Sequence, residues 1–236
     1  MAKLGLVVRP ILLLSIASTI LYASPAFSAP DEVEWSQLDI PGEGTPGGWV
    51  LARNSDVRHL TTATDGTLYA YANPSGTSHT LFRSTNGGCS WSHTGSVTDE
   101  IIDIAADPED DDTVYYATTS CVYKSSDGGD SFTELPPSPG GAGSNNLEIT
   151  AITMASLNGH NIIAVGTQDT DDAEYGGIYI LEEEEPFPSW VDTEIGNYDI
   201  YAVAFSPDLA TDAVTVAAVT DETRTYVAYN YGTPGD

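Results

Sequence analysis

Basic residues are scarce in this chain. Seven lysines and arginines stand against 35 aspartates and glutamates, which gives a formal net charge of −28. Such a surface repels nucleic acids and anionic lipid headgroups, because both carry dense negative charge. The composition therefore excludes a nucleic-acid-binding protein. Two explanations of the acidity stay open at this point: solubility, including in a salty medium, and the binding of divalent cations.

Cysteine and histidine are also scarce, with two cysteines and four histidines in 236 residues. Two cysteines are too few for a structural zinc site unless histidines complete it, and no histidine has a ligand spacing with them. A structural zinc site is therefore not expected.

Helical periodicity is the third absence, since almost no stretch spaces its apolar residues as an amphipathic helix does. Turn formers and aromatics are plentiful instead, with 22 glycines, 14 prolines and 13 tyrosines. Short apolar runs separated by glycine, proline, asparagine and aspartate are typical of strands. The sequence predicts an all-β protein, long enough for one large domain or two small ones.

The N-terminus is the one long apolar stretch. Lys3 and Arg9 flank the start of an apolar run over residues 11–22, and small residues follow over 23–29. This three-part layout predicts a secretory signal peptide over residues 1–29. The mature domain would then occupy residues 30–236.

Cleavage is expected between Ala26 and Ala29, although Pro30 disfavours a cut immediately before it. The alternative is an uncleaved anchor over residues 4–22, which is barely long enough to span a bilayer. In both cases the bulk of the chain is exported, to the medium or the cell surface, and any membrane attachment is through the leader.

An internal repeat organises the rest of the chain. Residues 84–91 read Ser-Thr-Asn-Gly-Gly-Cys-Ser-Trp, and residues 125–132 read Ser-Ser-Asp-Gly-Gly-Asp-Ser-Phe. Both copies follow the pattern Ser, any, Asp or Asn, any, Gly, any, any, aromatic. The repeated positions are Ser84, Asn86, Gly88, Trp91, Ser125, Asp127, Gly129 and Phe132.

Each part of the repeat has a mechanical role. An Asp or Asn accepts hydrogen bonds from backbone N–H groups ahead of it, and paired glycines supply the positive φ angles that a tight turn needs. The aromatic residue begins the return strand and covers the turn. We therefore predict a structural hairpin turn at each copy, with no direct part in catalysis.

The pattern resembles the Asp-box, or bacterial neuraminidase repeat. This repeat occurs in sialidases, sortilin-type receptors, xyloglucanase-type glycoside hydrolases and photosystem II assembly factors. The resemblance implies a β-propeller in which each Asp-box lies between the third and fourth strands of a four-stranded blade. The period of about 40 to 45 residues is also that of WD40-like and YVTN-like repeats.

With this repeat as a ruler, the sequence predicts about four blades. In the third, the acidic run 182–185 stands where the Asp-box should be, and we expect a solvated loop there. In the fourth, the chain ends before an Asp-box, so residues 33–38 are predicted to supply a closing strand. The chain is also expected to be part of a larger ring of six to eight blades. The predicted blades are approximately 57–97, 98–139, 147–196 and 197–236.

The repeat alignment separates Cys89 and Cys121. Cys89 lies in the turn of one repeat, and Cys121 opens a strand of the next, a separation of roughly 16 Å along a strand. A disulfide requires Cα atoms within about 7 Å. The sequence therefore disfavours a bridge, although an oxidising compartment would permit one.

Candidate catalytic groups are few. The Asp-box sialidases use three arginines and a tyrosine paired with a glutamate. The exported part of this chain has only Arg53, Arg58, Arg83 and Arg224, and Arg83 is expected on a strand away from a shared pocket. The Arg-Ile-Pro motif of sialidases is also absent, so sialidase activity is not expected. A glycosidase of the xyloglucanase type needs two carboxylates across a cleft. Asp103 is the best single candidate, because it interrupts an apolar strand; alternatively, it faces water in the central channel.

Two acidic loops are candidate calcium sites, and solvated turns are the alternative. Neither has the order of an EF-hand, because both lack the central glycine and the terminal glutamate. No other cofactor is expected. The first loop contains Asp107, Glu109, Asp110, Asp111 and Asp112, and the second contains Asp169, Asp171 and Asp172.

Taken together, the sequence predicts an exported, non-enzymatic propeller that binds a protein or a glycan, or serves as a scaffold. The alternative is an Asp-box glycoside hydrolase whose catalytic carboxylates lie partly outside this chain. The ligand itself is not specified by any motif.

Overall fold

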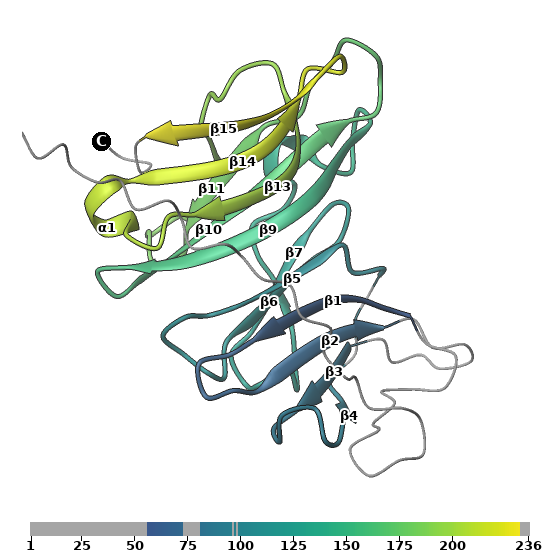
Figure 1. Ribbon diagram of the computed structural model, residues 1–236, viewed down its shortest axis with the longest axis vertical. Coiled ribbons are helices and arrows are strands. Elements are labelled where there is room, and N and C mark those ends of the chain that lie inside the picture. The colour runs from purple at the N-terminus through teal and green to yellow at the C-terminus, as the bar shows by residue number, and fades with distance from the viewer. Residues whose placement is uncertain (1–55, 73–80, 96, 98, 232–236) are drawn as a thin grey trace, which may run out of the picture. The chain divides into compact units, whose positions relative to one another are not determined.

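A computed structural model of the chain describes residues 56–72, 81–95, 97 and 99–231 (Figure 1). All of them belong to the unit that runs from Ile40 to Asp236. The predicted signal peptide (1–29) and closing strand (33–38) lie outside the described residues.

The described residues form four antiparallel sheets, which we call blades 1 to 4 in chain order. Blades 1 to 3 have four strands each and blade 4 has three, and neighbouring strands in each sheet are consecutive in the chain. Blade 1 contains β1 (Val57–Thr62), β2 (Leu68–Ala72), β3 (Leu81–Ser84) and β4 (Ser92–His93). Blade 2 contains β5 (Asp103–Ala106), β6 (Val114–Ala117), β7 (Val122–Ser125) and β8 (Thr133–Glu134).

The later blades have longer strands. Blade 3 contains β9 (Leu147–Leu157), β10 (His160–Asp169), β11 (Ile178–Glu182) and β12 (Val191–Asp192). Blade 4 contains β13 (Asp199–Phe205), β14 (Val214–Thr220) and β15 (Thr225–Tyr231). A 3₁₀ turn, η1 (Pro139–Gly141), precedes blade 3, and a single helical turn, α1 (Leu209–Asp212), lies in the β13–β14 loop.

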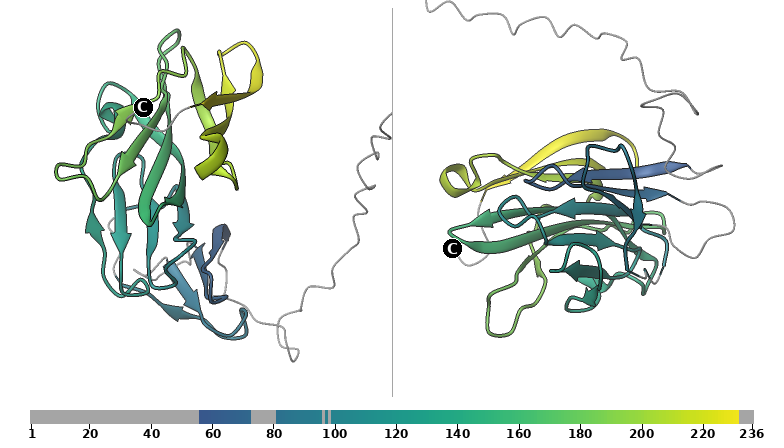
Figure 2. Two further views of the ribbon diagram at one scale, coloured as in Figure 1. Left: turned by 90° about the vertical axis from the view of Figure 1, so that its left-hand side faces the viewer. Right: turned by 90° about the horizontal axis from the view of Figure 1, so that it is seen from below.

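The blades pack face to face in chain order, and an apolar layer fills each space between them (Figure 2). The first strands of consecutive blades are neighbours, β1 beside β5, β5 beside β9 and β9 beside β13. The middle strands are the most buried, and Tyr115 and Ile163 are completely buried. This is the blade order of a β-propeller, with the first strand of every blade on the inner side.

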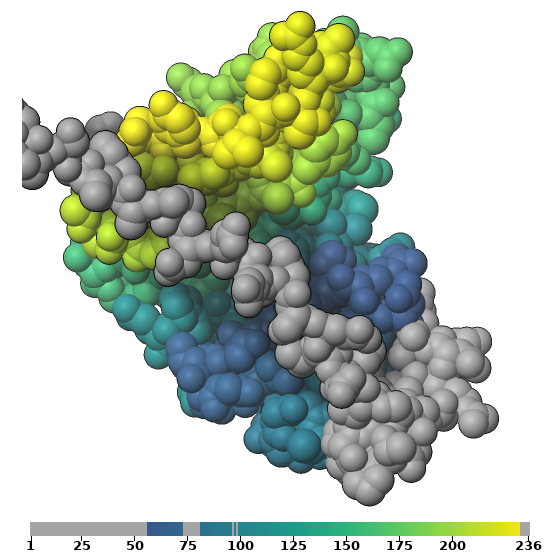
Figure 3. Space-filling model, viewed as in Figure 1, coloured from purple at the N-terminus to yellow at the C-terminus, as the bar shows by residue number. Residues whose placement is uncertain are grey.

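Blade 4 differs from the others because it has three strands in the described part of the chain, so its third strand, β15, forms its outer edge. Figure 3 shows the yellow surface of this C-terminal region exposed on the face in view. The β15 side chains Val227, Tyr229 and Tyr231 are largely exposed. The predicted partner of this edge, the segment 33–38, is not among the described residues, so the closing strand stays a prediction.

The strand and turn positions follow from local chemistry. In the β1–β2 turn, Gly66 has a φ of 87° and the Asp65 carboxylate accepts the Thr67 N–H at 2.7 Å. Asp and Gly favour such a turn, because Asp can bond to the backbone two residues ahead and Gly adopts positive φ without steric cost.

Blades 3 and 4 approach each other closely at Gly166 in β10. A Cβ added there would lie 2.5 Å from Cγ2 of Ile200 in β13, and Ile200 is itself fully buried. A β-bulge follows Gly166 in the pairing of β10 with β9. A side chain at this position has no room unless the two blades separate.

This contact gives a prediction for stability. The substitution Gly166→Ala should lower the free energy of unfolding by about 1–3 kcal/mol, because it overpacks the interface between blades 3 and 4. The double variant Gly166→Ala/Ile200→Ala should lose less free energy of unfolding than the sum of the losses in the two single variants. Urea unfolding of the four proteins measures this coupling.

Gly177→Ala is the matched control, since its added Cβ would meet Tyr179 at an ordinary 3.5 Å. Strict additivity of the Gly166 and Ile200 changes would contradict the packing described.

Candidate functional site

The second Asp-box forms the turn between β7 and β8. Its buried Ser125 Oγ accepts the Gly129 N–H at 2.8 Å and donates to Asp127 Oδ1 at 2.7 Å. Asp127 Oδ1 also accepts the Ser131 N–H at 2.9 Å. Gly128 and Gly129 have φ angles of 67° and 88°. The carboxylate therefore holds its own turn together.

The first Asp-box, between β3 and β4, has the same plan with one reversal. Ser84 Oγ accepts the Gly88 N–H at 2.9 Å, as Ser125 does in the second copy. Asn86, however, donates from Nδ2 to Ser90 Oγ at 2.8 Å, whereas Asp127 accepts from the corresponding Ser131 hydroxyl. Both side chains close the turn, and only the aspartate does so with a charge.

The aromatic residue of each copy packs against its own blade or turn. Trp91 lies beside Gly88, whose added Cβ would be 3.7 Å from the indole ring. Phe132 meets the buried Tyr116 edge to face, with ring centroids 4.8 Å apart.

The second Asp-box also contacts blade 1. Arg83 Nη1 donates to the Gly128 carbonyl at 2.6 Å, and the Gly95 N–H donates to the Gly129 carbonyl at 2.6 Å. Arg83 directly precedes the first Asp-box. The two repeats are therefore connected to each other, which is a packing role that fits their predicted structural part.

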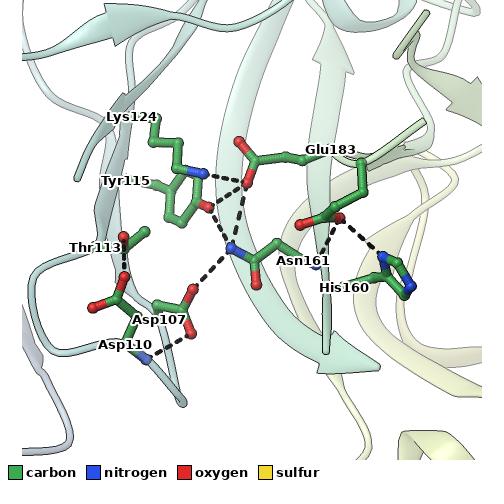
Figure 4. Close-up of polar contacts among 9 residues, drawn as sticks. Asp107, Asp110, Thr113, Tyr115, Lys124, His160, Asn161 and Glu183 are labelled. Carbon is green, nitrogen blue, oxygen red and sulfur yellow. Dashed lines mark hydrogen bonds and ion pairs between the residues drawn. The ribbon is translucent and has the colours of Figure 1, made fainter. Parts of the chain in front are cut away.

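A polar network joins blades 2 and 3 (Figure 4). We call it the Glu183 network; its members are Asp107, Tyr115, Lys124, Asn161 and Glu183. Glu183 Oε2 accepts the Tyr115 hydroxyl at 2.7 Å and pairs with Lys124 Nζ at 2.6 Å. Asn161 Nδ2 donates to Asp107 Oδ2 at 2.9 Å and lies 3.1 Å from the Tyr115 hydroxyl.

The network is shielded from solvent. The Glu183 side chain is 10% exposed, and Asp107 and Tyr115 are buried. Burial, and after it the hydrogen bond to Glu183, raises the pKa of the Tyr115 phenol far above its ordinary value. Tyr115 therefore stays protonated and donates at physiological pH. Glu183 Oε2 accepts from Tyr115, from Lys124 and, at 3.4 Å, from Asn161 Nδ2.

Glu183 corrects one prediction from the sequence. The acidic run 182–185 was expected to be a solvated loop, but Glu183 turns inward to Lys124 and Tyr115 of the preceding blade. Glu184 also accepts the Asn161 N–H, whereas Glu185 is exposed. The partners lie 59 and 68 positions away in the chain, so no local pattern could reveal them.

The first acidic loop uses its carboxylates on its own backbone. Asp107 Oδ1 accepts the N–H groups of Glu109 and Asp110, at 2.8 and 3.2 Å. Asp110 accepts the Asp112 N–H and the Thr113 hydroxyl. Asp111 is exposed. The other oxygen of Asp107, Oδ2, accepts from Asn161 Nδ2 at 2.9 Å.

The second acidic loop is also closed by local bonds. Asp169 Oδ1 accepts the Asp171 N–H, Asp171 accepts from Asn146, and Asp172 is exposed. Among the residues the structure describes, no three His, Cys, Asp or Glu side chains are grouped so as to hold a metal ion. Calcium binding at either loop stays a prediction.

Asp103, the candidate catalytic residue, opens the inner strand of blade 2. Its Oδ2 accepts the Ile152 N–H of β9 at 3.2 Å, and its Oδ1 accepts the Ile104 N–H at 2.9 Å and lies 3.4 Å from His59 Nδ1 of β1. The side chains of Asp103 and His59 are each 30% exposed. Asp103 therefore touches three blades at once.

Asp199 has a similar place in blade 4, and the sequence reasoning missed it. It is buried, and its Oδ1 accepts the N–H groups of Asp169 and Gly176, both at 2.9 Å. An Asp directly before the apolar run 200–205 was the available signal. Nearby, Thr150 Oγ1 donates to the Ile200 carbonyl at 2.5 Å.

Several smaller features complete the description. Arg58 pairs with Glu100 beside β1. Cys89 is exposed, Cys121 is half-buried, and both are free thiols. No helix in the described ranges is long and apolar enough to cross a membrane.

No protein-family model matches this sequence, and no curated protein sequence matches it. Among solved structures, an ancestral GH74 enzyme is similar with a TM-score of 0.52 and 17% identity, over 76% of this chain and 24% of that chain. The GH74 enzyme of Niastella koreensis has a TM-score of 0.48 and 19% identity, over 67% of this chain and 24% of that chain. The Trypanosoma rangeli sialidase in complex with the inhibitor DANA has a TM-score of 0.46 and 12% identity, over 71% of this chain and 30% of that chain.

The match to the ancestral GH74 enzyme, together with the four stacked antiparallel sheets, decides the fold. The described chain is a β-propeller. The predicted all-β class and blade architecture are confirmed. The chain spans about a quarter of the length of the two GH74 enzymes.

The Glu183 network gives a prediction that a solvated loop would not. Glu183→Ala should cost about 1–3 kcal/mol in the free energy of unfolding, because it leaves the Lys124 ammonium and Tyr115 hydroxyl without their shared acceptor. Glu185→Ala, two residues later in the same run, should change it by less than about 0.5 kcal/mol. Equal effects of the two changes in urea unfolding would rule out the described role of Glu183.

The two Asp-boxes differ in their expected pH dependence. Hydrogen bonds from Ser131 and then Ser125 lower the pKa of Asp127 to about 2. Its contribution to stability is therefore complete above the ordinary pKa near 4, and it disappears as the pH falls towards 2. The Tm difference between wild type and Asp127→Asn should shrink over this window.

Thermal unfolding at pH 5, 4, 3 and 2.5 measures that difference. Asp130→Asn is the control, because the exposed Asp130 carboxylate accepts no hydrogen bond from any described residue. A Tm difference for Asp127→Asn that is the same at every pH would contradict the prediction.

Proposed function

We propose that this chain is an exported, non-enzymatic β-propeller of the Asp-box type that binds a protein or a glycan, or acts as a scaffold for one. The observation that carries the proposal is the environment of Asp103. Both of its oxygens accept backbone N–H groups, and one of them also faces His59. Asp103, the strongest catalytic candidate, thus makes contacts to both neighbouring blades.

These contacts bear on catalysis because a glycosidase needs a carboxyl group that transfers a proton and a second one opposite it. A general acid has to carry a proton and deliver it to the leaving oxygen, and its partner carboxylate has to reach the sugar or a water. Both oxygens of Asp103 instead accept backbone N–H groups of the protein itself. Such an environment suits a structural acceptor better than a proton donor.

The Asp-boxes support the family assignment within this proposal. Two copies of the motif form turns with the same serine-to-glycine hydrogen bond and lie between the third and fourth strands of their blades. The strongly acidic composition supports an exported, soluble module, and the leader over residues 1–29 would direct its export.

One observation favours a second candidate, an Asp-box glycoside hydrolase. The fold match with a TM-score above 0.5 is to a GH74 enzyme, and this chain corresponds to about a quarter of it. Under this alternative, Asp103 would act together with a carboxylate outside the chain.

An assay of binding and turnover separates the two candidates. The full chain and Asp103→Asn would be tested against plant and bacterial polysaccharides, with retention measured by affinity electrophoresis and turnover by release of reducing ends. We expect no release, and equal retention of both proteins by any polysaccharide that binds. Release that falls about 100-fold or more in Asp103→Asn would establish the hydrolase instead, since that is the usual contribution of a general acid.

A further inference from the structure

A groove of about 440 Å³ lies beside β9, between two loops that each follow the first strand of a blade. The β5–β6 loop of blade 2 supplies Pro108 and Glu109. The β13–β14 loop of blade 4, which contains α1, supplies residues 205–211, and β9 supplies residues 153–156 (Figure 1). Three consecutive blades therefore line it.

The β9 side of the groove has an open backbone edge. The Ile152 N–H donates to Asp103 and therefore points away from β10. N–H and C=O groups alternate sides along a strand, so those of Met154 and Ser156 point the same way as those of Ile152. Outside the β9–β10 ladder, no hydrogen bond in the described ranges engages the backbone of either residue.

The groove is apolar with acidic edges. Pro108, Met154, Phe205 and Leu209 give it apolar surface, while its ionisable lining residues are Glu109 and Asp208. Both acids are exposed, and no lysine, arginine or histidine lines the groove. The net charge of −28 makes the electrostatic potential around the whole chain negative, as these two acids do in the groove.

We propose that this groove binds an extended, positively charged polypeptide segment, which pairs with the open edge of β9 at Met154 and Ser156. The proposal rests on the proposed binding function and narrows it to a protein ligand. Main-chain pairing supplies affinity in strand addition, and side-chain pockets supply selectivity. Arginine and lysine stems suit apolar walls, with their charged heads at the acids on the rim. A glycan has no backbone to complete a strand ladder.

The test uses the full chain and fluorescein-labelled nine-residue peptides that alternate valine with arginine or valine with glutamate. Fluorescence anisotropy at 150 mM salt should detect binding of the arginine peptide only. Glu109→Gln/Asp208→Asn should weaken that binding about tenfold, as expected for the loss of two charge contacts. Asp172→Asn/Glu185→Gln changes the net charge equally outside the groove and should have less than a twofold effect.

A second variant tests the strand pairing. Met154→Pro removes an N–H that faces the groove and keeps the ladder to β10, since proline is tolerated on an unpaired strand edge. It should weaken binding at least fivefold, whereas Met154→Ala should weaken it less, and circular dichroism would verify that both variants fold.

Three results would overturn the proposal. The first is that Glu109→Gln/Asp208→Asn and Asp172→Asn/Glu185→Gln weaken peptide binding equally. The second is no binding of the arginine peptide at 100 μM, and the third is undiminished binding by a folded Met154→Pro variant. Retention by a polysaccharide in the earlier assay would then leave the general binding function standing, so the two failures are distinguishable.

Discussion

The carboxylate of Asp103 connects blade 2 to both of its neighbours. It faces His59 in the first strand of blade 1 and accepts the Ile152 N–H from the first strand of blade 3. A propeller must hold its sheets face to face, although apolar layers alone allow them to slide. Directional hydrogen bonds at the inner strands fix the register between blades, and the same arrangement recurs where Asp199 of blade 4 accepts two N–H groups from blade 3.

The outer parts of the blades are joined by a second set of polar contacts. Between blades 1 and 2, Arg83 reaches the second Asp-box. Blade 3 has no Asp-box at its β11–β12 turn. Glu183 lies at that turn and connects blade 3 to Lys124 and Tyr115 of blade 2. A polar connection to the preceding blade is therefore present at this position as well, made with different residues.

The sequence predicted what depends on neighbouring residues. The turns at Asp65 and at the two Asp-boxes, and the strands between them, follow from bonds that span two to four positions. The partners of Glu183 and Asp199, and the Ile152 contact of Asp103, could not be predicted, because they lie 23 to 68 positions away in the chain. A burial pattern marks a strand, but it does not say which neighbouring blade an acid will meet.

The environment of Asp103 is an example of this limit. The blade architecture is similar to that of a GH74 enzyme, and the one catalytic candidate that the sequence offered, Asp103, contacts the first strands of both neighbouring blades. The first strand of blade 3, β9, is an edge strand of its sheet and lines a groove that also contains Glu109 and Asp208. The backbone N–H and C=O groups that stabilise a sheet where strands are paired can bind another chain where a strand edge is unpaired.

Native-state hydrogen exchange at the Ile152 amide tests the central claim most directly, because that N–H has the Asp103 carboxylate as its acceptor. In wild type this amide should be strongly protected, and Asp103→Ala should lower its protection about tenfold or more relative to the buried Ala164 amide of β10, as the loss of a hydrogen bond predicts. Unchanged relative protection of Ile152 in a folded Asp103→Ala variant would contradict the role of Asp103 as an anchor between blades.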